Sequence, residues 1–331
     1  MVELYVSWCK GLAQDKQALA MLKNCQIITG IETLNSKGER EPFQQAGLKV
    51  SIHNMIKLFH CCLSDKNLIS EFKKKENTHT LDNIRKSDAK AVGFHAYYKT
   101  QLIENHVRHG KPLPEGIFEN ESLEQIRERI VKNLVFLERN INKGLKKQKK
   151  VLFETQPFMD FTKLKNPVNK VSDQEMKLMK RAGMMCTPDF ISSVLNDKRI
   201  KNNKNIGFLF DIAHVFISVK TRFERKELND EIESYMKKII GACKGKVYQM
   251  HIACPVEIAR GCFVDDQVEL KKGDILSDHM LSIARQILKA NPDIKSITLE
   301  IDTYLEPVPH AKKMIQQAKM VAKELNLKVE K

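Results

Sequence analysis

The sequence predicts a (β/α)8 barrel, the TIM-barrel class of α/β folds. Eight short apolar or β-branched runs alternate along the chain with segments of helical periodicity. The chain has 331 residues, a length at which one barrel with long loops is common. The alternative is a doubly wound open sheet. It is disfavoured because no glycine-rich phosphate-binding turn follows the first run.

The expected strands are recognised by their apolar or β-branched composition. The run 206–212 is almost continuously apolar, which is typical of a strand buried on both faces of a parallel sheet. The other runs are rich in Ile, Val, Thr and Phe and are bounded by polar residues. In chain order the expected strands are 3–8, 26–34, 48–53, 90–95, 150–155, 206–212, 246–252 and 296–301.

The helices between these strands are predicted from their end signals. Helical stretches follow the first strand at 15–23 and the third strand to about residue 75. Ser122 and Gln125 form a capping box ahead of a long run of helical spacing. Pro188 stands at the first position of another helix. The remaining helices are expected to begin at Asn229, at Ser277 or Asp278 and at Pro309.

One domain, 1–331, is expected because the chain has no low-complexity linker and no internal repeat. The segments 99–121, 156–186 and 254–276 are expected to be insertions on the top of the barrel. The first of them contains glycines and prolines and is expected to be irregular.

Composition limits the class of protein only loosely. An excess of 56 Lys and Arg over 41 Asp and Glu gives a net charge of +15, which fits a nucleic acid, an acidic peptide or a lysine-rich surface. No apolar run approaches the length of a membrane span, and the first residues do not resemble a signal peptide. None of the 8 cysteines forms a C-x-x-C pair, so we expect reduced thiols in a cytoplasmic protein.

Imidazoles and carboxylates stand at the carboxyl ends of successive expected strands, the face on which TIM-barrel active sites lie. Burying such groups without compensation is costly, and no Lys or Arg stands at these ends to compensate them. Bound metal ions would compensate them, and His with carboxylate ligands suits Zn, Fe or Mn. The candidates at the strand ends are His53, His95, Glu154, Asp211, His214, His251 and Glu300.

Several motifs resemble the xylose isomerase-like barrel superfamily. The closest resemblance is to its family of multinuclear non-haem iron-dependent oxidative enzymes, and the next is to endonuclease IV. The motifs are Thr187-Pro188-Asp189-Phe190, the run from Gly207 to His214, His251-Ile252-Ala253, Asp278-His279 and Thr298-Leu299-Glu300. One difference is that Asp278 directly precedes His279, whereas both families usually have Asp-x-His after the seventh strand.

The resemblance implies a site of two or three metal ions. Glu154 would bridge ions, and Asp211, His251 and Glu300 would hold one or more of them. His53, His95, His214 and His279 would fill the remaining positions, and Asp278 is a further candidate ligand. The implied cofactor is iron, with zinc or manganese as alternatives.

The main functional expectation is dioxygen-dependent oxidation of a precursor peptide, with cysteine as the expected target and a partner protein that delivers the peptide. One alternative is an endonuclease IV-like zinc phosphodiesterase acting on DNA. Others are a mononuclear sugar isomerase or epimerase and a barrel whose site has decayed.

Overall fold

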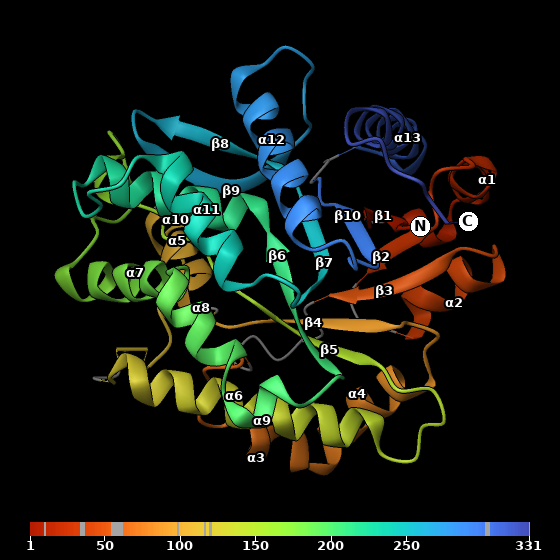
Figure 1. Ribbon diagram of the computed structural model, residues 1–331, viewed down its shortest axis with the longest axis horizontal. Coiled ribbons are helices and arrows are strands. Elements are labelled where there is room, and N and C mark those ends of the chain that lie inside the picture. Colours follow the sequence, from red (N-terminus) through yellow and green to blue (C-terminus); the bar gives the residue numbers. More distant parts are fainter. Residues whose placement is uncertain are drawn as a thin grey trace.

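Eight parallel strands form a closed barrel in the order β1-β10-β7-β6-β5-β4-β3-β2 (Figure 1). The computed structural model describes residues 1–9, 11–33, 37–53, 62–97, 99–115, 117–118, 121–301 and 305–330, without the side chains of 37–39 and 75–79. The strands of the barrel are β1 (Glu3–Ser7), β2 (Gly30–Thr33), β3 (Lys49–His53), β4 (Ala91–His95), β5 (Lys150–Glu154), β6 (Ile206–Asp211), β7 (Val247–Ile252) and β10 (Ser296–Leu299).

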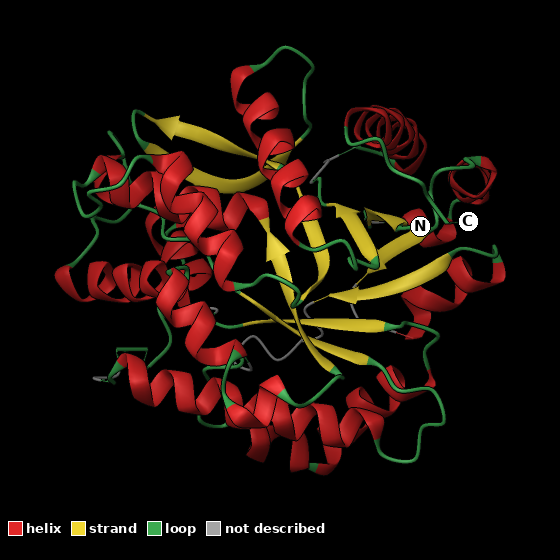
Figure 2. Ribbon diagram, in the orientation of Figure 1, coloured by secondary structure: helices red, strands yellow, loops and turns green. Residues whose placement is uncertain are grey.

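Helices surround this barrel, as Figure 2 shows, and their buried faces pack on the outside of the strands. In the described part of the chain, no helix is both long and apolar enough to cross a bilayer. The helices are α1 (Lys16–Asn24), α2 (Lys37–Gln45), α3 (Leu68–Lys73), α4 (Lys75–Lys86), α5 (Lys99–His109), α6 (Leu123–Asn142), α7 (Asp173–Met185), α8 (Pro188–Leu195), α9 (Lys198–Lys201), α10 (Ile212–Glu224), α11 (Ile232–Ala242), α12 (Ile275–Ala290) and α13 (Pro307–Glu324), with short 3-10 turns at Leu12–Gln14 and Phe161–Lys163.

The predicted barrel is confirmed, and every predicted strand overlaps an observed one. The capping box of Ser122 and Gln125 is present, and Pro188 begins α8. Three predicted helix starts are wrong. Helix α11 begins after Glu231 rather than at Asn229, and α13 begins at Pro307 rather than at Pro309. Helix α12 begins at Ile275 rather than at Ser277 or Asp278, because Asp274 caps it. Residues 54–61 of the predicted helical region lie outside the described residues.

The expected insertions contain regular structure that the sequence pattern did not indicate. Residues Lys99–His109 form α5, so the segment 99–121 is not irregular throughout. The segment after β7 forms an antiparallel hairpin of β8 (Cys254–Ala259) and β9 (Cys262–Val268). Figure 1 shows this hairpin beside α10 and α12, outside the barrel strands. Arg108 of α5 holds it through two hydrogen bonds to Asp266, at 3.1 and 2.9 Å.

Inside the barrel the side chains change character from one end to the other. Because side chains alternate along a strand, every second residue of each strand faces the interior. Leu152 and Leu209 form a small apolar cluster there with Ala91, and the ring of Tyr248 packs against it. Two residues further along their strands stand Glu154 and Asp211, so the interior becomes polar towards the carboxyl ends.

Lys149 is buried just before β5, and its ammonium group donates to the carbonyl oxygens of Ser87 and Ala89 at 2.7 and 2.8 Å. Burial lowers its pKa to about 8. Between about pH 8 and pH 10.5 the unfolded chain therefore binds more protons than the folded one, and stability rises with pH. We expect this group to add at most about 3 kcal/mol to the free energy of unfolding across that window.

The measurement is urea unfolding of the wild type and of Lys149→Met at pH 7.5 and pH 10. Other groups titrate equally in both proteins, so the difference between them isolates Lys149. The expected result is a smaller gain in stability with pH for the variant. Parallel pH profiles for the two proteins would contradict the buried, easily neutralised lysine.

Candidate metal centre

Four side chains from neighbouring strands converge at the carboxyl end of the barrel. Glu154 ends β5, Asp211 ends β6, His251 lies near the end of β7 and Glu300 follows β10. Strand pairing places Asp211 directly beside His251. The Nδ1 atom of His251 lies 2.9 Å from Glu300 Oε2, 3.6 Å from Asp211 Oδ2 and 3.7 Å from Glu154 Oε1. Three carboxylates thus surround one ring nitrogen.

These facing atoms are buried and none makes a hydrogen bond of good geometry. They are His251 Nδ1, Glu154 Oε1, Asp211 Oδ2 and Glu300 Oε2. Unpaired buried polar atoms are costly and rare in folded proteins. Carboxylate oxygens and an imidazole nitrogen are ligand types that suit a divalent cation. The ligand atoms that lie close to one another are those of Glu32, His53, His251 and Glu300, those of His53, His95 and Glu154, and those of Glu154, Asp211 and His214. The residues of this end of the barrel therefore fit metal ions, and we call the surroundings of His251 Nδ1 the central position.

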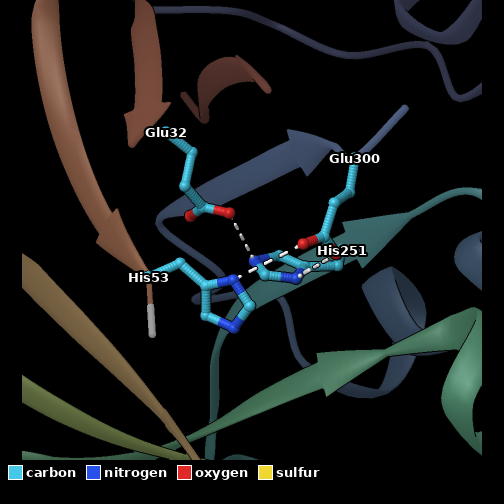
Figure 3. Close-up of side chains that lie close together, drawn as sticks. All are labelled: Glu32, His53, His251 and Glu300. Carbon is cyan, nitrogen blue, oxygen red and sulfur yellow. Dashed lines mark ion pairs between the residues drawn. The ribbon is translucent and has the colours of Figure 1, made fainter. Parts of the chain in front are cut away.

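Glu32 fixes the orientation of His251 from the other side of the ring. Its Oε2 lies 3.0 Å from His251 Nε2, and Figure 3 shows His251 between Glu32 and Glu300. The other oxygen of Glu32 accepts hydrogen bonds from Ser51 at 3.0 Å and from Thr298 at 3.1 Å. A proton on Nε2, donated to Glu32, leaves the lone pair of Nδ1 directed at the central position.

A second group of donors adjoins the central position. His53 Nε2 lies 2.6 Å and His95 Nε2 3.0 Å from the same oxygen, Glu154 Oε2. Since the two oxygens of Glu154 face different groups of donors, this carboxylate can bridge two ions. His53 Nδ1 also lies 3.4 Å from Glu300 Oε1.

A third group lies towards the β8–β9 hairpin. His214 Nδ1 is 2.8 Å from the carbonyl oxygen of Thr155, and His214 Nε2 is 2.7 Å from Asp265 Oδ2. If His214 Nδ1 donates its proton to the carbonyl oxygen, His214 Nε2 carries no proton. His214 Nε2 and Asp265 Oδ2 are then two hydrogen-bond acceptors in contact, so a proton or a cation must lie between them. Glu154, Asp211 and His214 have ligand atoms close enough to hold a common ion.

The carboxylates and imidazoles of this site shift one another's pKa values. Burial raises the pKa of Glu154 and Glu300, but the histidines beside them outweigh burial and hold both pKa values well below their usual range. Burial lowers the pKa of His53, yet Glu154 and Glu300 raise it to about 10. A metal ion would take the place of the imidazole protons, so its binding would release them.

The structure brings together seven of the nine predicted ligands and leaves two apart. Asp278 is exposed in the first turn of α12. The ring of His279 packs on Phe216 with a centroid distance of 5.5 Å. Neither belongs to a cluster of possible ligands among the described residues. The physical reason is the early start of α12, which carries both residues away along the helix.

Two residues of the site were missed in the sequence. Glu32 is a carboxylate near the end of a strand, as the predicted ligands are. The predicted strand 26–34 extends beyond the observed end of β2, so Glu32 lies inside it rather than at its end. Asp265 had no signal, because the hairpin that carries it was not predicted. Burial raises the pKa of Asp265 to about 7.

Replacing Glu32 by Gln is expected to weaken metal binding about 10–100-fold, the usual cost of losing an outer hydrogen-bond partner of a metal-ligating histidine. The amide keeps the shape but can present N–H to His251 Nε2, which favours the wrong tautomer. Metal affinity is measured by competition with a chelator. Ser51→Ala is the matched control, since it removes one contact to Glu32 and leaves the Glu32–His251 pair.

Solved structures with this fold include sugar-processing and metal-binding proteins. D-psicose 3-epimerase in the presence of D-fructose matches with a TM-score of 0.56 and 11% identity over 98% of this chain and 100% of that one. A xylose isomerase domain protein from Planctomyces limnophilus has a TM-score of 0.56 and 12% identity over 98% of each chain. IolI with a zinc atom has a TM-score of 0.51 and 16% identity, also over 98% of each chain.

The chain has the xylose isomerase-like TIM-barrel fold. At these identities the likeness establishes the fold alone. No family model matches the sequence, and no curated protein matches it in sequence.

Proposed function

We propose that this chain is a metal-dependent isomerase or epimerase of a small hydroxycarbonyl compound such as a ketose. The observation that carries the proposal is the convergence of Glu154, Asp211 and Glu300 on His251 Nδ1, with the facing atoms left unpaired. An ion bound there would polarise the substrate carbonyl. Similar structures include a ketose epimerase and a zinc-bound protein, which supports this choice.

Two carboxylates of the central position can move the proton that such a reaction requires. Glu300 is 14% exposed at the mouth, whereas Glu154 is fully buried. Both are ionised, because the neighbouring histidines lower their pKa values, and Glu300 at the mouth is the one placed to accept a proton from the carbon next to a carbonyl. Returning the proton to the other face of that carbon is epimerisation, and returning it to the neighbouring carbon is isomerisation.

Solvent deuterium incorporation tests the proposal. Protein loaded in turn with Zn²⁺, Mn²⁺, Co²⁺ or Mg²⁺ is incubated with D-fructose, D-tagatose or D-psicose in D2O, and label next to the carbonyl is read by NMR. We expect incorporation that falls at least about 100-fold in Glu300→Gln, within the range for a general base. Metal-bound protein that exchanges no ketose would overturn the proposal.

A second candidate function is favoured by the additional imidazoles. His53, His95 and His214 exceed the need of a single ion, so we also propose a multinuclear iron site that oxidises a peptide with dioxygen, the peptide being delivered by a partner protein. Protein expressed with iron and purified without oxygen should then hold two or more irons per chain. One tightly held zinc and no iron would exclude this candidate, and cleavage of abasic DNA would favour the phosphodiesterase instead.

A further inference from the structure

The interior rows that carry the metal centre continue to the other end of the barrel, where they end in lysines. On β5 the inward positions are Lys150, Leu152 and Glu154, and on β3 they are Lys49, Ser51 and His53. Because side chains alternate strictly along a strand, Lys150 and Lys49 enter the barrel at its amino end. This end is therefore opposite to the metal centre.

Lysines stand at the start of six consecutive strands of the barrel or within the two residues before it. In barrel order these strands are β3, β4, β5, β6, β7 and β10. We call the set the basic floor: it consists of Lys49, Lys90, Lys150, Lys204, Lys246 and Lys295. Neighbouring strands lie about 4.8 Å apart, so the backbone positions of these lysines are closely spaced, although only Lys49 and Lys150 are in register with inward residues of their strands.

Acidic groups balance only one side of this floor. Lys49 and Lys90 both contact Glu3 Oε1, at 2.8 and 2.6 Å. Glu330 lies 3.8 Å from Lys49. Asp88 is a further carboxylate at this end of the barrel, and its negative charge raises the pKa of Tyr5. This half of the floor is close to neutral.

The other half, made by Lys150, Lys204, Lys246 and Lys295, contacts no carboxylate in the part of the chain that is described. Lys150 lies over the ring of Tyr248 at 5.5 Å, and Lys246 donates to the carbonyl oxygen of Lys201 at 3.2 Å. Burial lowers the pKa of Lys150, and the charges of Lys204, Lys246 and Lys295 lower it further.

We propose that this half of the basic floor binds a compact oligophosphate. Like charges gathered without counter-charges oppose folding, and a polyanion removes that cost. Lysine serves as a point charge for phosphate groups, which do not require a planar bidentate partner. The site is separate from the metal centre and does not depend on the proposed function.

Spacing favours a phosphate chain over an acidic peptide. In an extended peptide, carboxylates on one side recur every second residue, about 6.6 Å apart. The lysines start from strands about 4.8 Å apart, which is a closer spacing than such a peptide presents. An oligophosphate carries its charges on adjacent groups and so matches the denser array.

Titration calorimetry with inorganic tripolyphosphate at 150 mM salt tests the proposal. The test variant is the triple replacement Lys150→Met, Lys246→Met and Lys295→Met. We expect its binding to be at least tenfold weaker than that of the wild type. Without ligand the variant should be at least as stable in urea as the wild type, because it loses repulsion and keeps the apolar stems of the side chains.

The matched control replaces exposed lysines of α7, α11 and α13, Lys177→Met, Lys237→Met and Lys319→Met, which changes the net charge equally. It should keep wild-type affinity, and so should Glu154→Gln. An equal loss in the control would show non-specific attraction, and a loss in Glu154→Gln would place the anion at the metal centre. Either result would overturn the proposal. So would the absence of tripolyphosphate binding at concentrations below 1 mM. A triple variant that loses binding of duplex DNA but keeps binding of tripolyphosphate would overturn it as well.

Discussion

Replacing Glu154 by Gln is expected to remove most bound metal and to abolish activity. The Oε2 atom of Glu154 lies 2.6 Å from His53 and 3.0 Å from His95, and its Oε1 faces the central position. One substitution therefore weakens two groups of donors while keeping the shape of the side chain. Loss of an outer partner costs about 10–100-fold in metal affinity, and we expect more than 100-fold here.

Metal content by mass spectrometry and activity of the same preparation are the measurements. The matched control is Glu104→Gln, which removes another buried glutamate charge, one paired with Arg108 on α5 at the edge of the hairpin. Circular dichroism shows whether each variant is folded. A folded Glu154→Gln protein with wild-type metal content would mean that the carboxylate is not a ligand, and both candidate functions would then lose their basis.

The site was predictable where strand order decides it. His53, His95, Glu154 and Asp211 end parallel strands, and His251 lies one residue before the end of another. Parallel strands bring their carboxyl ends to one face of a closed barrel. Their convergence therefore follows from the fold once the strands are located. The pattern of period two along each strand then selects the inward side chains.

Positions that depend on the loops were not predictable in the same way. His279 was placed at the site from a motif, but the cap formed by Asp274 starts α12 early and sends His279 to Phe216. Asp265 reaches His214 because Arg108, more than 150 residues earlier in the chain, holds the adjacent Asp266. Such contacts between distant segments leave no periodic pattern in a single sequence.

Replacing Gly30 by Ala is expected to destabilise the barrel by more than about 4 kcal/mol, a value reached by few single substitutions. A methyl group at this position would lie 2.6 Å from the carbonyl carbon of Lys49 and 2.9 Å from Cε1 of Tyr5. Lys49 is the strand partner of Gly30, so its backbone cannot withdraw without breaking the pairing of β2 with β3. Overpacking at backbone therefore costs more than overpacking at a side chain.

The same shift would displace Glu32, two residues further along β2, and with it the contact that orients His251. Urea unfolding measures the stability, and chelator competition measures the metal affinity of whatever folds. The control is Gly241→Ala in α11, where nothing lies within 4 Å of the new methyl and we expect a gain of about 0.5–1 kcal/mol. A Gly30→Ala protein that does not fold would agree with the prediction, because it would have lost all of its stability. A Gly30→Ala protein within 1 kcal/mol of the wild type would instead show that β2 and β3 pack less closely than this, and the placement of Glu32 against His251 would have to be abandoned with it.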